Sequence, residues 1–388
     1  MANSLSFDDI STILNSIMKQ ATGQAAQTIT NTSDFVAVAN TTLLAGYDQV
    51  LDAISQVMDR AIFSVRPYTA KFQGIRVDER RFGNHTRKLT QIDKPFEEDV
   101  RYELTDGAEG NMFQINLPKT LQTNFYGGQV FQKSYTWMKD QLDMAFRGPD
   151  ELAQYWTMVT QNVSDMIEQA HENMARYAVA NFIAGKANID AGNVIHLLTE
   201  YNTATGQELT ATTVMTADNY VAFMQWVYAR IAQLCAMLTE RSQIFHVNIT
   251  GKEVQRHTPY ANQRIFLYSG ARYQIENRVL ADIYHDNYLR MALTESVNFW
   301  QSIKTPDSIN LTASIINSAN GQVTGVEQQV DNIFGLIIDE EAVGHTTINQ
   351  WSGTTPFDVR EGFATTYYHF TDRYWNDFTE NGIVLLLD

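Results

Sequence analysis

The sequence predicts an α+β protein in which long helices and β segments occupy separate stretches of the chain. Three observations support this class: one apolar helical face runs from Pro149 to Gly185, glycine-punctuated alternating segments fill residues 66–131, and two apolar β-type runs lie near the end. The chain has 388 residues, 44% of them hydrophobic, so it can bury a large core. We therefore expect two domains or one elaborated domain.

The first sixty residues are predicted to form two helices joined by a polar connector. Apolar residues recur at helical spacing over 7–18, and Ser6 precedes them as an N-cap candidate. A second apolar stripe covers residues 43–62 and follows two further cap candidates, Thr41 and Thr42. The connector between the stripes has few bulky apolar residues, so we expect this terminal arm to need another surface to lie against.

The next segment, residues 66–131, is predicted to form a long two-stranded β excursion. Apolar and polar residues alternate in Lys71–Val77 and again in Met112–Leu117, as in half-buried strands. Between them, the stretch from Arg80 to Lys94 is charged and contains glycine, which is typical of a loop tip. An isolated hairpin is marginally stable in water, so we expect the excursion to pack on a neighbour.

The strongest helical signal begins at Pro149 and is expected to stop at Gly185. A helix of that length would extend roughly 50 Å, beyond the ordinary globular range. Further helices are predicted from Thr216 to about Leu238 and near Val279–Tyr284.

The last third of the chain is predicted to be a polar loop followed by β structure. Residues 305–322 are mostly polar and are expected to form the loop. Ile333–Ile338 and Ile383–Leu387 are short apolar runs typical of buried strands.

The distribution of charge separates two parts of the chain. The formal net charge of −16 argues against a protein whose main task is to neutralise phosphates. Residues 71–101 nevertheless carry eight basic and six acidic side chains, whereas residues 306–388 carry two basic and twelve acidic ones. These segments are either solvated surface or complementary contact surfaces between copies of the protein. The sequence contains no run of 18 consecutive apolar residues, so it predicts no membrane-spanning helix.

Histidine and carboxylate groups provide no recognisable metal motif. His171 and Glu172 lie on the long predicted helix, but the second histidine of the zinc-protease motif is missing, so no metal site is predicted there. Asp282, His285 and Asp286 have helical spacing, and a solvated polar face explains them better than a cation site does.

Other candidate chemical groups are also better explained by structure. Gly321–Gly325 lacks the lysine and hydroxyl residue of a phosphate-binding loop, and the single Cys235 lies in an apolar run that predicts a buried thiol. Glu340 and Glu341 are adjacent, so on a strand they would point to opposite faces. The aromatic residues of 367–375 are more typical of strand packing than of a carbohydrate platform. We predict no catalytic, cofactor-binding or metal-binding residues.

The order of the elements resembles that of major capsid proteins of tailed bacteriophages, of the HK-ninety-seven type. The predicted elements of this chain and those of the capsid proteins follow the same order: an N-terminal arm, an extended β loop, a long spine helix, a central α/β region and a final β run. Two stretches carry the likeness to capsid proteins of small short-tailed phages: Met112–Leu121 with Phe125, Tyr126, Gln129–Gln132, Leu142 and Phe146, and Asp339 with Arg360–Phe363, Tyr367–Phe370 and Asn381–Leu387.

The resemblance implies a division of the chain into the parts of that shell fold. Residues 1–65 would form the N-terminal arm and residues 66–135 the extended loop, or E-loop. Residues 136–241 would form the peripheral domain with the spine helix, residues 242–345 the axial domain, and residues 346–388 the return to the peripheral domain.

The resemblance also implies the function and the partners. The protein would self-assemble as hexamers and pentamers into an icosahedral shell in the bacterial cytoplasm, with a separate scaffolding protein and a portal. The shell would enclose double-stranded DNA by confinement, with no membrane. The E-loop residues Arg76, Arg80, Arg81, Arg87 and Lys88 are predicted to meet acidic surface on a neighbouring subunit.

Two other functions remain open from the residues alone. An encapsulin-like compartment would share the shell fold and enclose protein cargo. A soluble carbohydrate-active enzyme would require two carboxylates roughly 5–9.5 Å apart in a cleft.

Overall fold

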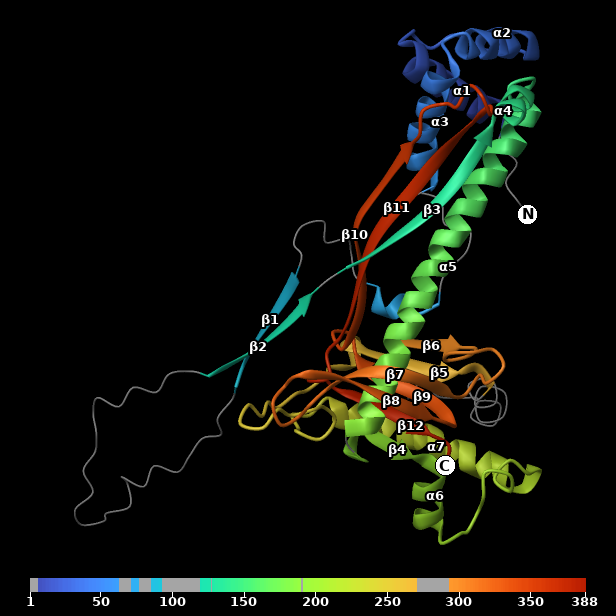
Figure 1. Cartoon of the computed structure of the whole chain (residues 1–388). Coiled ribbons are helices and arrows are strands. Elements are labelled where there is room, and N and C mark those ends of the chain that lie inside the picture. Colours follow the sequence, from blue (N-terminus) through green and yellow to red (C-terminus); the bar gives the residue numbers. More distant parts are fainter. Residues whose placement is uncertain are drawn as a thin grey trace, which may run out of the picture.

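A long helix organises the protein, with a helical arm at one of its ends and a mixed α/β body at the other (Figure 1). The structure is a computed structural model. It describes residues 6–62, 71–76, 85–92, 119–126, 128–189, 191–270 and 293–388.

The N-terminal arm contains three helices: α1 (Phe7–Thr22), α2 (Thr32–Leu43) and α3 (Tyr47–Ile62). Ser6 caps α1 as predicted, and its side chain forms a reciprocal capping box with Asp9. The predicted connector is wrong, because α2 begins inside it after the N-cap Asn31. Thr41 and Thr42 are therefore the last turn of α2 and cap nothing. Residues on all three helices share one apolar cluster, which supplies the core that the segment lacks locally.

The spine helix α5 covers Pro149–Ile189, 41 residues, and the short α4 (Lys139–Ala145) precedes it. The predicted start at Pro149 is confirmed, whereas the predicted stop at Gly185 is wrong. Gly185 lies inside the helix, where a Cβ atom would collide with the ring of Phe378. That ring stacks on Phe182 with centroids 5.4 Å apart. The glycine therefore serves close packing and does not end the helix.

Replacing Gly185 by alanine is expected to destabilise the protein by about 1–3 kcal/mol, because the new methyl group overpacks the contact with Phe378. Alanine normally stabilises an exposed helix interior by about 1 kcal/mol relative to glycine. Urea unfolding of the unassembled subunit measures the sign. In a Phe378→Ala background the same substitution should become neutral or stabilising, and an unchanged penalty there would contradict the packing explanation.

A three-stranded antiparallel sheet, in the order β10–β11–β3, lies along the upper part of the spine helix (Figure 1). Its strands are β3 (Gln129–Met138), β10 (Val343–Thr354) and β11 (Phe363–Asn376). Trp137 of β3 is buried and donates a 2.7 Å hydrogen bond to the hydroxyl of Thr366 on β11. The sheet packs on the arm, because residues of its apolar face belong to the same cluster as the arm helices.

The body is built on a five-stranded mixed sheet in the order β4–β12–β9–β5–β6. Its strands are β4 (Val194–His196), β5 (Gln263–Tyr268), β6 (Leu293–Val297), β9 (Ile333–Asp339) and β12 (Gly382–Leu386). The two predicted terminal strands are confirmed as β9 and β12, which pair with each other. Both faces are buried: Val384 packs with the lower end of the spine, and Ile383 packs with the cluster around α7.

Two helices cover one side of this sheet: α6 (Leu197–Thr205) and α7 (Ala217–Leu238). The predicted helix from Thr216 is confirmed as α7, with Thr216 at the N-cap position. By length and composition alone α7 is apolar enough to cross a membrane, but core helices meet the same criterion. Its apolar residues, including Phe223 and Val227, are buried against the sheet.

The predicted polar loop at 305–322 is wrong, because it contains a strand. β7 (Ile309–Ile316) pairs with β8 (Val323–Val330) as a hairpin, with Gly321 at φ 72° in the connection. Alternate residues of β7 are buried against the spine helix. The polar residues between them lie on the other face of the strand, and they made the segment resemble a loop in the sequence. The helix predicted near Val279–Tyr284 lies outside the described residues.

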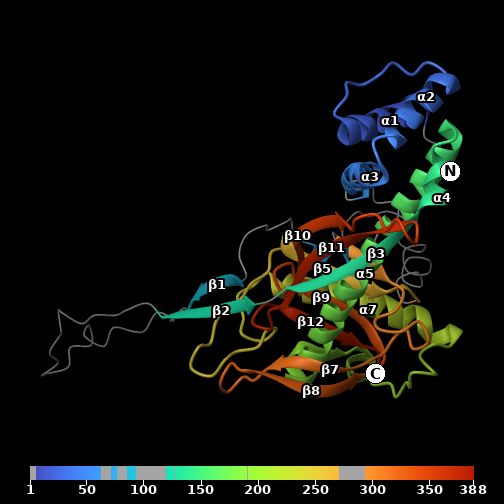
Figure 2. The same ribbon diagram turned by 45° about the horizontal axis from the view of Figure 1, so that its top comes forward.

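The predicted β excursion is present as an antiparallel ribbon of β1 (His85–Gln91) and β2 (Thr120–Tyr126), which projects from the body (Figures 1 and 2). The predicted position of the first strand is wrong, since β1 falls within the stretch Arg80–Lys94 that was assigned to the tip. Residues 73–75 form a 3-10 turn where a strand was expected. Met112–Leu117 lies outside the described residues.

Candidate functional site

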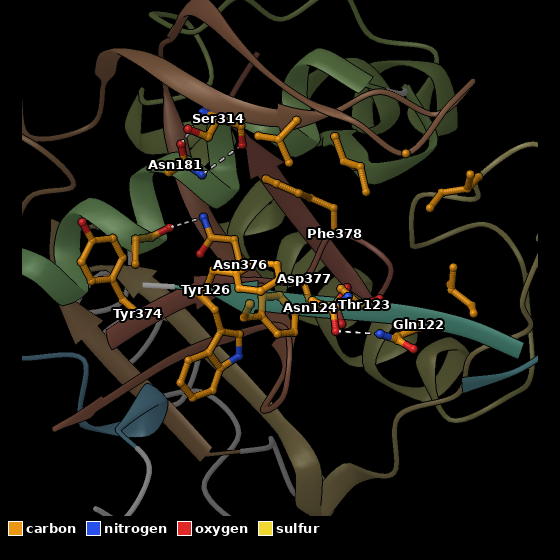
Figure 3. A pocket seen from close by; sticks show the side chains of 18 of the residues that line it. Gln122, Thr123, Asn124, Tyr126, Asn181, Ser314, Tyr374, Asn376, Asp377 and Phe378 are labelled. Atoms are coloured by element: carbon orange, nitrogen blue, oxygen red, sulfur yellow. Dashed lines mark hydrogen bonds between the residues drawn. The ribbon is translucent and has the colours of Figure 1, made fainter. Parts of the chain in front are cut away.

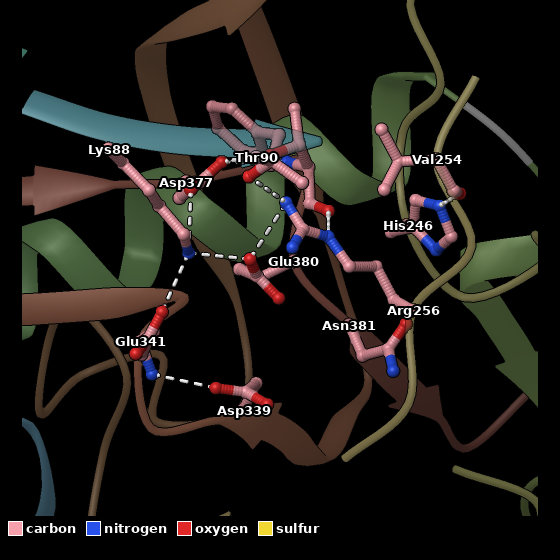
Figure 4. A network of polar contacts seen from close by, with 12 residues as sticks. Lys88, Thr90, His246, Val254, Arg256, Asp339, Glu341, Asp377, Glu380 and Asn381 are labelled. Atoms are coloured by element: carbon pink, nitrogen blue, oxygen red, sulfur yellow. Dashed lines mark hydrogen bonds and ion pairs between the residues drawn. The ribbon is translucent and has the colours of Figure 1, made fainter. Parts of the chain in front are cut away.

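The ribbon is attached to the body by a cluster of charged side chains around Lys88 (Figure 4). The Lys88 ammonium lies 2.5 Å from a Glu380 oxygen, 2.8 Å from Glu341 and 3.3 Å from Asp377. Arg256 completes this group, which we call the Lys88 cluster. Asp377 and Glu380 are almost fully buried, so the lysine neutralises charge that water does not reach.

Arg256 links the ribbon to the same carboxylates. Its guanidinium lies 3.0 Å from a Glu380 oxygen and donates hydrogen bonds to the Thr90 hydroxyl and to the Thr379 carbonyl. Lys88 and Thr90 are two residues apart on β1, so both point toward the body. Arg87 and Leu89 alternate with them and are exposed. The period-two pattern of the strand therefore sets one face of the ribbon against the body.

The electrostatics of the cluster favour a permanently charged lysine. Burial alone would lower the pKa of Lys88, but Asp377 and Glu380 raise it above its usual value. Burial raises the pKa of Glu380, and Lys88 and Arg256 offset this in part. Asp377 is held in place by hydrogen bonds from the backbone N–H and the hydroxyl of Thr379. The arrangement fixes a position and contains no group prepared for proton transfer.

Three of the five predicted contact residues, Arg76, Arg87 and Lys88, lie in the described part of the chain. Lys88 pairs within its own chain, as does Arg76, whose guanidinium lies 3.4 Å from Glu168 on the spine helix. Arg87 is exposed on the outer face of the ribbon. Arg80 and Arg81 lie outside the described residues. Contact of these residues with a neighbouring subunit stays a prediction.

A pocket of about 720 Å³ lies between the ribbon and the body (Figure 3). Its walls come from β2, the spine helix, the β7–β8 hairpin, and the end of β11 with the segment after it. Asn181 holds the hairpin wall by accepting a 2.7 Å hydrogen bond from the backbone N–H of Ser314. At the rim, Tyr126 and Val323 are 73% and 68% exposed. The pocket has an apolar rim without a catalytic constellation among its described residues.

The other chemical candidates are occupied by structural contacts. Cys235 is buried, and burial raises the pKa of its thiol to about 11, as expected for an inert cysteine. Glu340 and Glu341 lie in the turn after β9, where they pair separately with Arg264 and Lys88. The expectation that they lie on a strand is wrong, although they are still not an acid–base pair.

The remaining candidate sites that the structure describes are also parts of the fold. Gly321–Gly325 forms the connection and the start of β8 in a hairpin. In the aromatic segment, Tyr368 and Phe370 are buried in the sheet, as expected for strand packing. Asp282, His285 and Asp286 lie outside the described residues.

Sequence reasoning missed Arg256 and the individual roles of Asp377 and Glu380. The acidic excess of the C-terminal segment was visible, but Lys88 and Glu380 are 292 residues apart. The alternation of Lys88 and Thr90 was the local signal that one face of this strand is anchored.

Comparison with known proteins identifies the fold. A family model described as Phi29-like phage major capsid protein matches residues 14–386. A chain in the capsid structure of Staphylococcus phage Andhra is 11% identical, with 84% of this chain and 86% of that chain covered and a TM-score of 0.55. A chain in the structure of the head fiber and inner core protein of native bacteriophage P68 is 10% identical, with coverages of 82% and 85% and a TM-score of 0.56. No curated protein matches the chain. The structural matches confirm the predicted fold.

Proposed function

Because this chain belongs to the Phi29-like phage major capsid protein family and is a phage shell protein, we propose that its copies assemble into an icosahedral shell that encloses double-stranded DNA. The family match over residues 14–386 carries this proposal. The shell would be built from hexamers and pentamers, and the protein would be part of the virion. The role is structural. The compartment and carbohydrate-active alternatives gain no support from the matches.

Exposed apolar side chains on the projecting elements support contact between copies. Leu89, Tyr126 and Val130 are 62–73% exposed along the ribbon and the start of β3, and Leu44 at the arm is 86% exposed. Large apolar groups on protruding segments are costly to hydrate, and burial against another subunit removes that cost. The ribbon and the arm are therefore the elements that we assign to intersubunit contact.

The charged residues divide into two roles in this proposal. Lys88 and Arg76, paired within the subunit, set the direction in which the ribbon leaves the body. Arg80, Arg81 and Arg87 would meet acidic surface on the adjacent subunit, such as that of residues 306–388. One exposed ion pair contributes only about 0.2–1 kcal/mol, but the many copies of a shell multiply a weak contact.

Charge reversal of two arginines, Arg80→Glu with Arg81→Glu, is expected to leave the subunit folded and to reduce the yield of particles. The reason is that the substitution turns attraction to the acidic neighbour into repulsion. Sucrose-gradient sedimentation measures particle yield, and circular dichroism of the unassembled fraction checks the fold. Replacing Lys304, a basic residue outside the ribbon, by Glu is the control. A normal particle yield for the double variant would contradict the proposed contact.

The division of the chain and the further partners complete the proposal. We assign residues 1–65 to the arm, 66–135 to the E-loop, 136–241 and 346–388 to the peripheral domain, and 242–345 to the axial domain. A scaffolding protein and a portal would take part in assembly in the host cytoplasm. The net charge of −16 fits DNA that is confined by the wall and not tightly bound to it.

Negative-stain electron microscopy of the purified full chain, expressed with and without the scaffolding protein of its genome, tests the shell proposal directly. We expect closed particles of uniform diameter under at least one condition. Nuclease treatment of particles from infected cells would leave the enclosed DNA intact. Uniform monomers under every condition would overturn the proposal.

A further inference from the structure

A cluster of two histidines and one aspartate is buried where the spine helix crosses the β10–β11 pair. His171 comes from α5, His345 from β10 and Asp372 from β11, and their exposed fractions are 3%, 2% and 0%. The Nε2 atoms of both histidines lie 3.0 Å from the same oxygen, Oδ2 of Asp372. The three potential ligand atoms lie within 4.8 Å of one another.

The backbone places these side chains together. In the antiparallel register His345 is opposite Tyr374, and Thr347 is opposite Asp372. Asp372 and Tyr374 are two residues apart on one strand, so His345 and Asp372 project from the same face. The rings of His171 and His345 have centroids 5.2 Å apart, so the spine helix presents His171 to that face.

Hydrogen bonding within the protein leaves this cluster incomplete. Nε2 of His345 is hydrogen-bonded to Oδ2 of Asp372, but within the described part of the chain neither ring nitrogen of His171 has a hydrogen-bond partner, and Oδ1 of Asp372 has none either. His171 Nε2 is therefore near the carboxylate without being aligned with it. Buried polar atoms in native proteins rarely stay unpaired, so these atoms point to a bound species.

A shared metal ion would account for this misalignment. A metal ion bound to both atoms does not lie on the line between the nitrogen and the oxygen. The lone pair of the nitrogen then points at the ion and not at the oxygen. With zinc bonds of about 2.0–2.1 Å to nitrogen and oxygen, tetrahedral ligand atoms are about 3.3 Å apart. The observed nitrogen–oxygen distances of 3.0 Å are close to this value.

The chemical types of the side chains in the cluster also suit a cation. Two imidazoles and one carboxylate are ligand types that zinc commonly uses in proteins. Oε1 of Glu168 lies 4.0 Å from Nδ1 of His171. Nε2 is therefore the ring nitrogen of His171 that faces Asp372, at 3.0 Å from Oδ2.

We propose that His171 Nε2, His345 Nε2 and Asp372 Oδ2 bind one divalent transition-metal ion, with Zn²⁺ the best match to two imidazoles and a carboxylate. The ion ties the spine helix to both strands of the β10–β11 pair. Sequence spacing around His171 and Glu172 predicted no metal, because the other two ligands come from strands near the C-terminus.

Metal content of the purified full chain tests this site. After treatment with a chelator and dialysis against Zn²⁺ or Co²⁺, the wild-type protein should retain about one ion per chain, and bound Co²⁺ should show the strong visible absorption of tetrahedral coordination. Retention should also raise the melting temperature. His345→Ala and Asp372→Asn should each bind at least tenfold more weakly and lose the metal-dependent rise in melting temperature.

Matched controls separate this site from other histidines. His196 lies 2.6 Å from Asp388 in an exposed pair, and His369 stacks on Trp351 on the same hairpin. His196→Ala and His369→Ala should keep the ion. If the alanine variant does not fold, His345→Cys retains a ligand and should add a sulfur-to-cobalt charge-transfer band. A metal-free wild-type chain after dialysis, unchanged binding in the variants, or the absence of that band would each overturn the proposal.

Discussion

Replacing Lys88 by alanine is expected to lower the free energy of unfolding by about 3 kcal/mol, because it leaves Asp377 and Glu380 buried beside each other with fewer positive partners. Arg256 still contacts Glu380, so the loss falls mainly on Asp377 and on the attachment of the ribbon. Urea unfolding of the unassembled subunit measures the change. Since β1 would no longer be held to the body, the yield of particles should fall as well.

The neighbouring Arg87 provides the matched control for this prediction. It lies on the same strand and carries the same charge, but it is exposed on the opposite face. Arg87→Ala should leave the free energy of unfolding within about 0.5 kcal/mol of the wild-type value. An equal loss for both variants would mean that general charge, and not the Lys88 cluster, stabilises the ribbon. A Lys88→Arg variant should retain most of the stability, because the guanidinium keeps the charge.

The helices were predictable because their signals are local. The cap of α1, the proline that begins α5 and the apolar face of α7 are each visible within a few turns of sequence. The end of α5 was missed for a non-local reason. Gly185 leaves room for the ring of Phe378, which lies far along the chain, and does not end the helix. The segment containing α2 was missed because its core is supplied by two other helices.

The β elements were harder because strand register depends on the partner. Residues of β1 are mostly polar, and only their pairing with β2 and the contacts of Lys88 and Thr90 determine which face is buried. The same limit applies to both polar clusters. Lys88 with Glu380, and His171 with His345, are joined by the fold of the whole subunit, so neither pair forms a motif in the sequence.

Replacing Trp137 by alanine is expected to have the largest effect on stability of the substitutions considered, a loss of about 3–5 kcal/mol. The indole is 1% exposed and packs on Tyr135 and Tyr155, with centroid distances of 4.8 and 5.8 Å. Its loss opens a cavity between β3 and the spine helix and also leaves the Thr366 hydroxyl without its 2.7 Å donor. Thermal and urea unfolding of the subunit measure the loss.

Trp351 supplies the control for this last substitution, because it lies in the same sheet but is 49% exposed and stacks on His369 at the surface. Trp351→Ala should cost less than about 1 kcal/mol if burial decides the effect. Trp137→Phe should recover part of the apolar packing and none of the hydrogen bond, so its stability should lie between wild type and Trp137→Ala. Since Trp137 joins the sheet to the cluster shared with the arm helices, particle assembly should fail for Trp137→Ala even below its melting temperature. Normal particles from that variant would show that the arm does not depend on this junction.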